Sequence, residues 1–317
     1  MATELIPSII WVVLGLFLLE RSSDAFVDGS AMLARRFKVS PFVIGMVVIG
    51  FGTSAPELCV SLMAGLGNRA NLSLGNAYGS CVFNVAAILG VSAVIFPLIV
   101  KRRAVMFAGP ALAAISLLSW WLLSDGVVSR LDALTLLVVF AVFFPFYCWY
   151  NRDRAVQEPD ANQPPVRIPV AAVKLLLGLV VLVGSSQLLV YGACNLARAM
   201  GVSELMIGLT VVAVGTSLPE LAAAIQSARR GQTEFVIGNI IGSNIFNLLA
   251  VVGIACAFNG ARDFSPNVTL RDLPAIFLTS LTIALFGRHG RISRLSGALW
   301  IGFFVFYSVL TVLQEIP

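Results

Sequence analysis

The sequence has few charged residues, and this shortage excludes the soluble classes of protein. Only 12% of its 317 residues are charged, whereas 58% are hydrophobic, and the mean hydropathy is +0.93. A soluble domain carries about a quarter charged residues, because its surface must face water. The sequence therefore predicts an all-α polytopic membrane protein embedded in a lipid bilayer.

The chain also lacks the residues of most redox and transition-metal sites. Its one histidine, His289, lies in a basic loop, and its cysteines form no CxxC pair. Reduced structural thiols are expected at Cys59, Cys81, Cys148, Cys194 and Cys256. No apolar segment with a small-residue cleavage site stands apart, so no removable signal peptide is predicted. The net charge of +5 is explained by basic cytoplasmic loops, so no nucleic-acid partner is expected.

Long apolar stretches, by contrast, are abundant. A membrane-spanning helix needs about 20 apolar residues. Ten segments qualify, at residues 5–33, 40–66, 72–98, 104–123, 131–150, 169–198, 203–228, 235–258, 270–287 and 294–314. The polar, proline-rich stretch 151–168 separates five of them from the other five. The sequence thus predicts two five-helix halves, 1–150 and 169–317, joined by a linker.

Basic residues are distributed unevenly between alternate loops. Fifteen of the 21 Lys and Arg residues lie in the loops on the linker side, and five lie in the other loops. Cytoplasmic loops collect basic residues. This asymmetry predicts that the linker 151–168 is cytoplasmic and that both termini lie outside.

A pair of motifs occurs twice, at a constant offset of 163 residues. IGMVVIGFGTSAPEL at 44–58 matches IGLTVVAVGTSLPEL at 207–221, and GNAYGSCVFN at 75–84 matches GNIIGSNIFN at 238–247. The duplicated blocks therefore cover 44–90 and 207–253. Because each half has an odd number of spans, the second half would enter the membrane from the opposite side. Such inverted repeats are typical of secondary transporters that bind substrate near the bilayer midplane.

Each copy places a proline and an acid inside a span. Pro56 and Pro219 remove a backbone donor and should interrupt the second and seventh helices. Glu57 and Glu220 follow them directly. A charge at the bilayer centre costs about 2.5–3.5 kcal/mol on insertion scales. Two acids at matching positions therefore indicate a functional site.

Oxygen-bearing side chains accompany both acids. In each copy a threonine lies four residues before the glutamate and shares its helix face, and Asn and Ser recur every four residues along the partner helix. Hard cations such as Ca²⁺ take six to eight oxygen ligands. Two carboxylates would balance one divalent cation, and they would equally hold protons or, with neutral oxygens, Na⁺. The sequence offers no nucleophile–base arrangement, so an enzyme is not expected, and a passive cation channel is the remaining alternative.

At these residues the sequence resembles the Ca²⁺/cation antiporter superfamily, specifically its bacterial sodium/calcium exchanger-like branch. The resemblance covers both duplicated blocks and the five-plus-five layout. It implies exchange of Ca²⁺ for Na⁺ by alternating access in a bacterial plasma (inner) membrane, with the first and sixth spans sliding against the rest. The transported ions are substrates, so no cofactor and no obligate protein partner are implied.

The resemblance also implies a set of ion ligands. They are Glu57, Glu220, Thr53, Ser54, Thr216, Ser217, Ser80, Asn84, Ser243 and Asn247, with backbone carbonyls from Gly50 and Ala213. Many members carry an Asp at the last position of one or both repeats, where this chain has Asn84 and Asn247. With only two acids, less negative charge is available for several Na⁺ ions, and H⁺-coupled Ca²⁺ exchange is the alternative.

The first span carries an acidic face that is not duplicated. Glu20, Asp24 and Asp28 are spaced by four residues, and so lie on one side of a helix. Two interpretations stay open: a vestibule that attracts cations, or a solvated face near the cytoplasmic end beside Arg21 and Arg35.

Overall fold

The computed structural model describes residues 2–150, 166–200 and 213–315. Up to the linker, the elements are α1 (Ala2–Phe37), α2 (Pro41–Ile44), η1 (Gly45–Gly50), α3 (Phe51–Thr53), α4 (Ala55–Leu66), α5 (Ala70–Val82), η2 (Phe83–Leu89), α6 (Gly90–Ile95), β1 (Leu98–Ile99), α7 (Arg102–Leu122), β2 (Val127–Val128) and α8 (Arg130–Tyr150). After it come α9 (Ile168–Ala199), α11 (Ala213–Gly215), α12 (Leu218–Arg229), α13 (Thr233–Ile245), η4 (Phe246–Val251), α14 (Val252–Ala257), β3 (Ala261–Arg262), η5 (Val268–Asp272), α15 (Leu273–Gly287), β4 (Arg291–Ile292) and α16 (Arg294–Glu315).

The helices are those of an integral membrane protein. Eight helical stretches in the described residues are long and apolar enough to cross a bilayer, and a pair bent by 46°, Pro41–Thr53 with Ala55–Leu66, makes a ninth. These nine correspond to nine of the ten expected spans. Part of the other one, residues 203–212, lies outside the described residues, so the count of ten stays a prediction.

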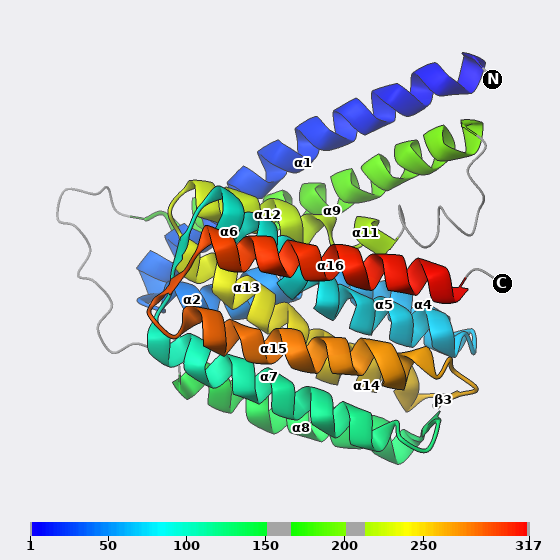
Figure 1. Cartoon of the computed structure of the whole chain (residues 1–317). Helices are drawn as coiled ribbons and strands as arrows, with labels where there is room; N and C mark the ends of the chain where they lie inside the picture. The colour runs from blue at the N-terminus through cyan, green and yellow to red at the C-terminus, as the bar shows by residue number, and fades with distance from the viewer. Residues whose placement is uncertain (1, 151–165, 201–212, 316–317) are drawn as a thin grey trace.

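A central bundle and a peripheral helix pair differ in their surroundings. Figure 1 shows α1 and α9 running side by side along one edge of the molecule. Only 22% of the most apolar stretch of each is buried, against 83% for the span Thr233–Ala257. Apolar side chains of α1 such as Ile6, Val13 and Phe17 are exposed. The pair is therefore a lipid-facing edge, whereas α13 is the core of the bundle.

Glycines set the approach between α1 and α9. A Cβ atom on Gly15 would meet the backbone nitrogen of Leu189 at 2.9 Å, and one on Gly178 would meet that of Phe26 at 2.7 Å. Gly15 and Gly178 are 163 residues apart, and so are Phe26 and Leu189. The two contacts are therefore equivalent under the sequence repeat. Small residues allow this close packing of helices in a membrane, so the two copies contact each other through equivalent positions.

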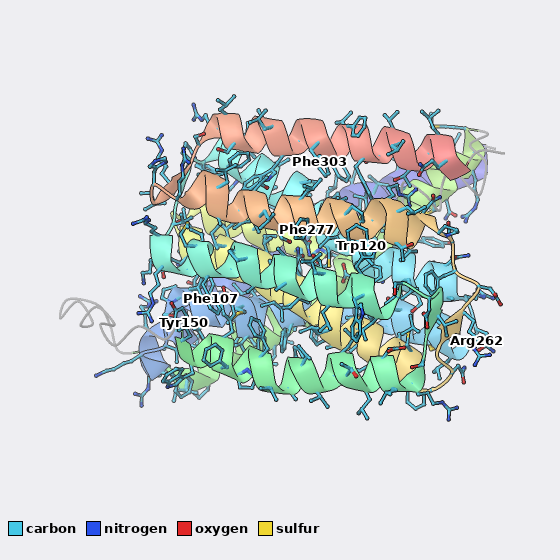
Figure 2. All side chains as sticks on the ribbon, turned by 60° about the horizontal axis from the view of Figure 1, so that its bottom comes forward. Phe107, Trp120, Tyr150, Arg262, Phe277 and Phe303 are labelled. Atoms are coloured by element: carbon cyan, nitrogen blue, oxygen red, sulfur yellow. The ribbon has the colours of Figure 1, made fainter. Side chains whose placement is uncertain are left out.

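The two ends of the bundle carry different parts of the chain. The marked chain ends lie at the right of Figure 1, whereas Tyr150, the last residue of α8, lies at the left of Figure 2, a view that keeps the same horizontal axis. The Arg103 guanidinium lies 4.3 Å from the centre of the Tyr150 ring. An aromatic side chain beside a cation is typical of a membrane–water interface. The end of α8, which is the last described residue before the linker, thus lies at the opposite end of the bundle from the termini.

In the part of the chain that the structure describes, four segments have the wider turns of a π-helix: η1, η2, η4 and η5. Asn84 lies in η2 and Asn247 lies in η4. π-turns inside α-helices occur frequently at functional sites. Aromatic packing supports one of them, because the Phe51 ring lies 4.5 Å from the rings of both Phe144 and Phe246. This packing holds the broken helix at α3 against η4.

Candidate functional site

The two expected helix interruptions are confirmed. The helix α3 ends at Thr53 and α4 begins at Ala55, while α11 ends at Gly215 and α12 begins at Leu218. Each proline lies in the first turn of the new helix, where its missing N–H leaves no bond unmade, and each glutamate follows it there. A helix N-terminus favours an acidic group by about 0.3–1 kcal/mol. The breaks therefore place both acids where the backbone stabilises negative charge.

The carboxyl groups are held by serines of the opposite copy. The Ser54 hydroxyl donates to Glu220 Oε1 at 2.9 Å, and the Ser217 hydroxyl donates to Glu57 Oε1 at 2.8 Å. All four residues have an exposed fraction of zero. Ser54 and Ser217 are 163 residues apart, and so are Glu57 and Glu220. The two hydrogen bonds are therefore equivalent under the sequence repeat. Both acids therefore point into the protein at the junction of the two breaks, and not toward lipid.

Amides of the partner helices satisfy the backbone around each acid. Asn76 on α5 donates to the Glu57 carbonyl oxygen at 3.1 Å, and Asn239 on α13 donates to the Glu220 carbonyl oxygen at 3.3 Å. The Ser80 hydroxyl reaches Glu57 Oε1 at 3.5 Å. The Asn–Ser stripes of α5 and α13 thus pack against the broken helices.

Thr53 and Ser243 form a second layer of contacts. The Thr53 hydroxyl donates to the Ile49 carbonyl oxygen at 2.9 Å and reaches Asn239 Oδ1 at 3.4 Å. The Ser243 hydroxyl donates to the Gly50 carbonyl oxygen at 3.1 Å. The Gly50 carbonyl oxygen also accepts the Ser54 N–H at 3.1 Å, so both of its lone pairs already have donors in this structure.

Several buried polar atoms have no hydrogen-bond partner among the described residues. Five of these atoms belong to predicted ion ligands: Glu57 Oε2, Glu220 Oε2, Asn84 Oδ1 and both polar atoms of the Asn247 amide. Buried polar groups without partners are rare and costly. Four of these five atoms are oxygens, contributed by both copies. This set fits a cation that takes oxygen ligands.

The remaining predicted residues are located less fully. Thr216 is buried in the turn between α11 and α12, and Ala213 is the first residue of α11. Across the part of the chain that the structure describes, no group of three or more His, Cys, Asp or Glu residues gathers. The predicted site therefore holds two acids among neutral oxygens.

Two contributors were not identified in the sequence. The Ser186 hydroxyl on α9 donates to the Gly215 carbonyl oxygen at 2.8 Å, next to the second break. Asn244 on α13 binds the Asn84 amide at 3.0 Å. Asn244 is not repeated, because its counterpart is Cys81, whereas the counterpart of Ser186 is Ser23, which donates to the Glu20 carbonyl oxygen instead. The duplicated motifs highlight only residues common to both copies, so the one available signal for Asn244 was a buried amide inside an apolar helix.

The acidic face of the first span is ion-paired. Asp24 and Asp28 both bind Arg230, which follows α12, with the Arg230 Nη1 group 3.2 Å from Asp28. Lys174 on α9 lies 2.6 Å from Asp28, and the Gln226 amide also donates to Asp24. Neither the vestibule nor the solvated-face interpretation included these pairs. The face joins α1 to α9 and to the end of α12.

Broken helices that bury an acid from each of two sequence repeats define a class of protein: a membrane transporter with its site inside the bundle. The chain belongs to the sodium/calcium exchanger protein family, whose model matches residues 7–149 and 170–313. This membership makes it a transporter and not an enzyme, and no cofactor is indicated.

Relatives and solved structures agree with this assignment. The chain is 36% identical over 315 residues to the putative antiporter CaxA of Alkalimonas amylolytica, covering 95% of this chain and 97% of that protein. It is 35% identical to the inner membrane protein YrbG of Escherichia coli, covering 86% of each. A structure of the sodium-calcium exchanger NCX_Mj, soaked with Na⁺ and Sr²⁺, superposes with a TM-score of 0.85 at 31% identity, covering 99% of both chains.

Proposed function

We propose that this protein is an antiporter that exchanges Ca²⁺ for Na⁺ by alternating access. The observation that carries the proposal is the pair of crossed bonds, Ser54 to Glu220 and Ser217 to Glu57, with a second carboxyl oxygen of each acid left without a partner among the described residues. Two carboxylates match the charge of one Ca²⁺ ion. The neutral oxygens beside the carboxylates suit Na⁺, because an ion with a single charge needs fewer negatively charged ligands than Ca²⁺.

The ion ligands in this proposal come from the two breaks and from the helices that pack against them. Glu57 and Glu220 supply charge, and the neutral oxygens come from Thr53, Ser54, Thr216, Ser217, Ser80, Asn84, Ser243, Asn247 and the carbonyls of Gly50 and Ala213. A hard cation prefers such oxygens over sulfur or imidazole. The limited negative charge would let the ion leave again, as transport requires.

The architecture in this proposal is ten helices in two inverted five-helix repeats, 1–150 with motif 44–90 and 169–317 with motif 207–253. Two equivalent helix contacts support this architecture. Gly15 lies against Leu189, and Gly178, which is 163 residues after Gly15, lies against Phe26. The linker 151–168 would be cytoplasmic and both termini outside, in a bacterial plasma (inner) membrane. The basic residues on the linker side support this orientation.

The counter-ion is tested in proteoliposomes loaded with Na⁺. An outward-directed Na⁺ gradient should drive uptake of ⁴⁵Ca²⁺, and Glu57→Gln should abolish it. A pH gradient at equal Na⁺ should give little uptake. If the pH gradient alone drives uptake equally well, the coupling ion is H⁺ and the alternative of an H⁺-coupled Ca²⁺ exchanger replaces this proposal.

A passive channel is tested in the same vesicles. An antiporter should show no Ca²⁺ flux without an opposing ion to exchange, whereas a channel would pass Ca²⁺ down its own gradient and give single-channel currents. Ungated currents in a planar bilayer would contradict antiport.

A further inference from the structure

Asn244 contacts its own counterpart in the other copy. It lies on α13 directly after Ser243, it is fully buried, and the offset of 163 residues relates it to Cys81. The Asn244 Nδ2 group donates to the Cys81 carbonyl oxygen at 3.1 Å, and the Cys81 thiol lies 3.9 Å from the Asn244 carbonyl oxygen. The two copies therefore meet at this pair, one position contributing an amide side chain and the other a thiol.

The donors and acceptors at this junction fix which way two amides face. A carbonyl oxygen only accepts, so the end of the Asn244 side chain at Cys81 must be the Nδ2 donor. The other end, Oδ1, then faces Asn84 and accepts its Nδ2 group at 3.0 Å. The Asn84 Oδ1 atom is left buried without a partner among the described residues. Reversing the Asn84 amide would bring two oxygens together.

The equivalent amide in the other copy has no such support. The position that would hold Asn247 is occupied by Cys81, whose thiol is a weak donor and acceptor without an amide oxygen. Neither polar atom of the Asn247 side chain has a hydrogen-bond partner among the described residues. The sequence repeats Asn84 as Asn247, but among the described residues only the Asn84 amide has a hydrogen-bond partner that orients it.

We propose that Asn244 is a positioning residue that fixes the Asn84 amide with its oxygen free to bind the transported cation, whereas the Asn247 amide is oriented only by the cation itself. This inference rests on the proposed function. A ligand oriented before binding saves the free energy of ordering it. Asn244 thus sets the affinity for the ion through Asn84 and without contacting the ion.

The test is a double-mutant cycle on ⁴⁵Ca²⁺ uptake by the full-length protein in Na⁺-loaded proteoliposomes. Asn244→Ala should raise the KM for Ca²⁺ about three- to tenfold, the worth of a hydrogen bond of about 0.5–1.5 kcal/mol, with a smaller change in maximal rate. Asn84→Ala should raise it at least as much. The double variant should show no further increase over Asn84→Ala, because Asn244 would act through Asn84.

Asn259→Ala is the matched control. Its amide also donates to backbone carbonyls, those of Gly65 and Leu66, both at 3.3 Å, but it lies beyond the end of α14. It should leave the KM for Ca²⁺ unchanged. A merely structural role for Asn244 would instead give the same loss of maximal rate with or without Asn84.

Three results would overturn the inference. One is an unchanged KM in Asn244→Ala, and another is a double variant whose KM increase is the product of the two single increases. If Asn244→Ala does not fold, Asn244→Gln keeps both a donor for the Cys81 carbonyl oxygen and an acceptor for Asn84, on a side chain one methylene group longer. Its KM should then stay within threefold of the parent, and a larger rise is the third such result. Absence of Ca²⁺ uptake in the parent protein would refute the proposed function before any variant is compared.

Discussion

The two copies of the duplicated motif are alike at their acids and different around them. Ser54 and Ser217 bind the acid of the opposite copy at nearly the same distance. Their neighbours diverge, because Ser80 reaches Glu57 whereas its counterpart Ser243 donates to the Gly50 carbonyl. Charge is thus placed symmetrically, while the neutral oxygens are not. The two acids and their serines, which are placed symmetrically, would set the charge of the bound ion. The neutral oxygens, which are placed asymmetrically, would set which ion of that charge is preferred.

The largest expected effect tests the symmetric part. Glu57→Gln and Glu220→Gln should each reduce Ca²⁺ transport on the order of 100-fold or more, since even residues behind the ligands contribute about 10–100-fold to metal affinity. The measurement is initial ⁴⁵Ca²⁺ uptake driven by a Na⁺ gradient. Glu234→Gln is the control, because this acid pairs with Lys101 at 3.0 Å at a partly exposed site. A large loss of uptake in only one of the two variants would show that Glu57 and Glu220 do not contribute equally.

A smaller effect is expected from the crossed serine bonds. Ser54→Ala and Ser217→Ala should each lower the apparent Ca²⁺ affinity by about 10–100-fold, because hydrogen bonds to charged groups contribute about 1.5–3 kcal/mol. The two losses should agree within a factor of three. Ser116→Ala removes a buried hydroxyl that donates within its own helix, to Ala113, and should not change affinity. Unequal losses would show that one copy dominates binding.

The asymmetric part is tested by adding the same charge to each copy. Asn84→Asp removes the donor to Asn244 and sets two acceptors against each other, at a cost of about 1–3 kcal/mol. Asn247→Asp breaks no hydrogen bond to a described residue and adds negative charge to the site. We expect the larger fall in melting temperature for Asn84→Asp, which alone breaks a hydrogen bond, and a lower KM for Ca²⁺ for Asn247→Asp only. Identical behaviour of the two variants would contradict the asymmetry.

The smallest effect concerns the ion pairs at one end of the bundle. Arg230, which binds Asp24 and Asp28, has Gly67 as its counterpart in the first copy. These partly exposed pairs are each worth about 0–1 kcal/mol, so Arg230→Gln should change uptake less than about fivefold. The change in melting temperature should shrink at high salt, because salt screens exposed charges. A large loss that does not depend on salt would assign Arg230 a different role.

Much of the architecture was predictable from local signals. The ranges of the spans follow from apolar length, and the interruptions at Pro56 and Pro219 follow from the loss of a backbone donor. The π-turns that carry Asn84 and Asn247 were not predictable, because an apolar helix with one extra residue per turn keeps no distinctive pattern. The pairing of α1 with α9 was likewise not predictable. Gly15 and Gly178 allow a close approach of helices, but the sequence does not indicate which helix packs against each of them.

The site was predictable where the two copies agree. The acids, their serines and the Asn–Ser stripes were all identified from repetition. Asn244 was missed because repetition cannot highlight a residue that differs between copies. The ion pairs of Asp24 were missed because Arg230 reaches α1 only through the tertiary fold.

The crossed bonds have a consequence for how such a protein is put together. Since the acid of each half takes its hydroxyl from the opposite half, a single half expressed alone would leave its carboxyl unsupported in an apolar interior. The smallest unit that satisfies both acids is therefore the pair of halves. Under the proposed inverted-repeat architecture, an ancestor with one copy would have needed a second molecule of itself inserted in the opposite orientation.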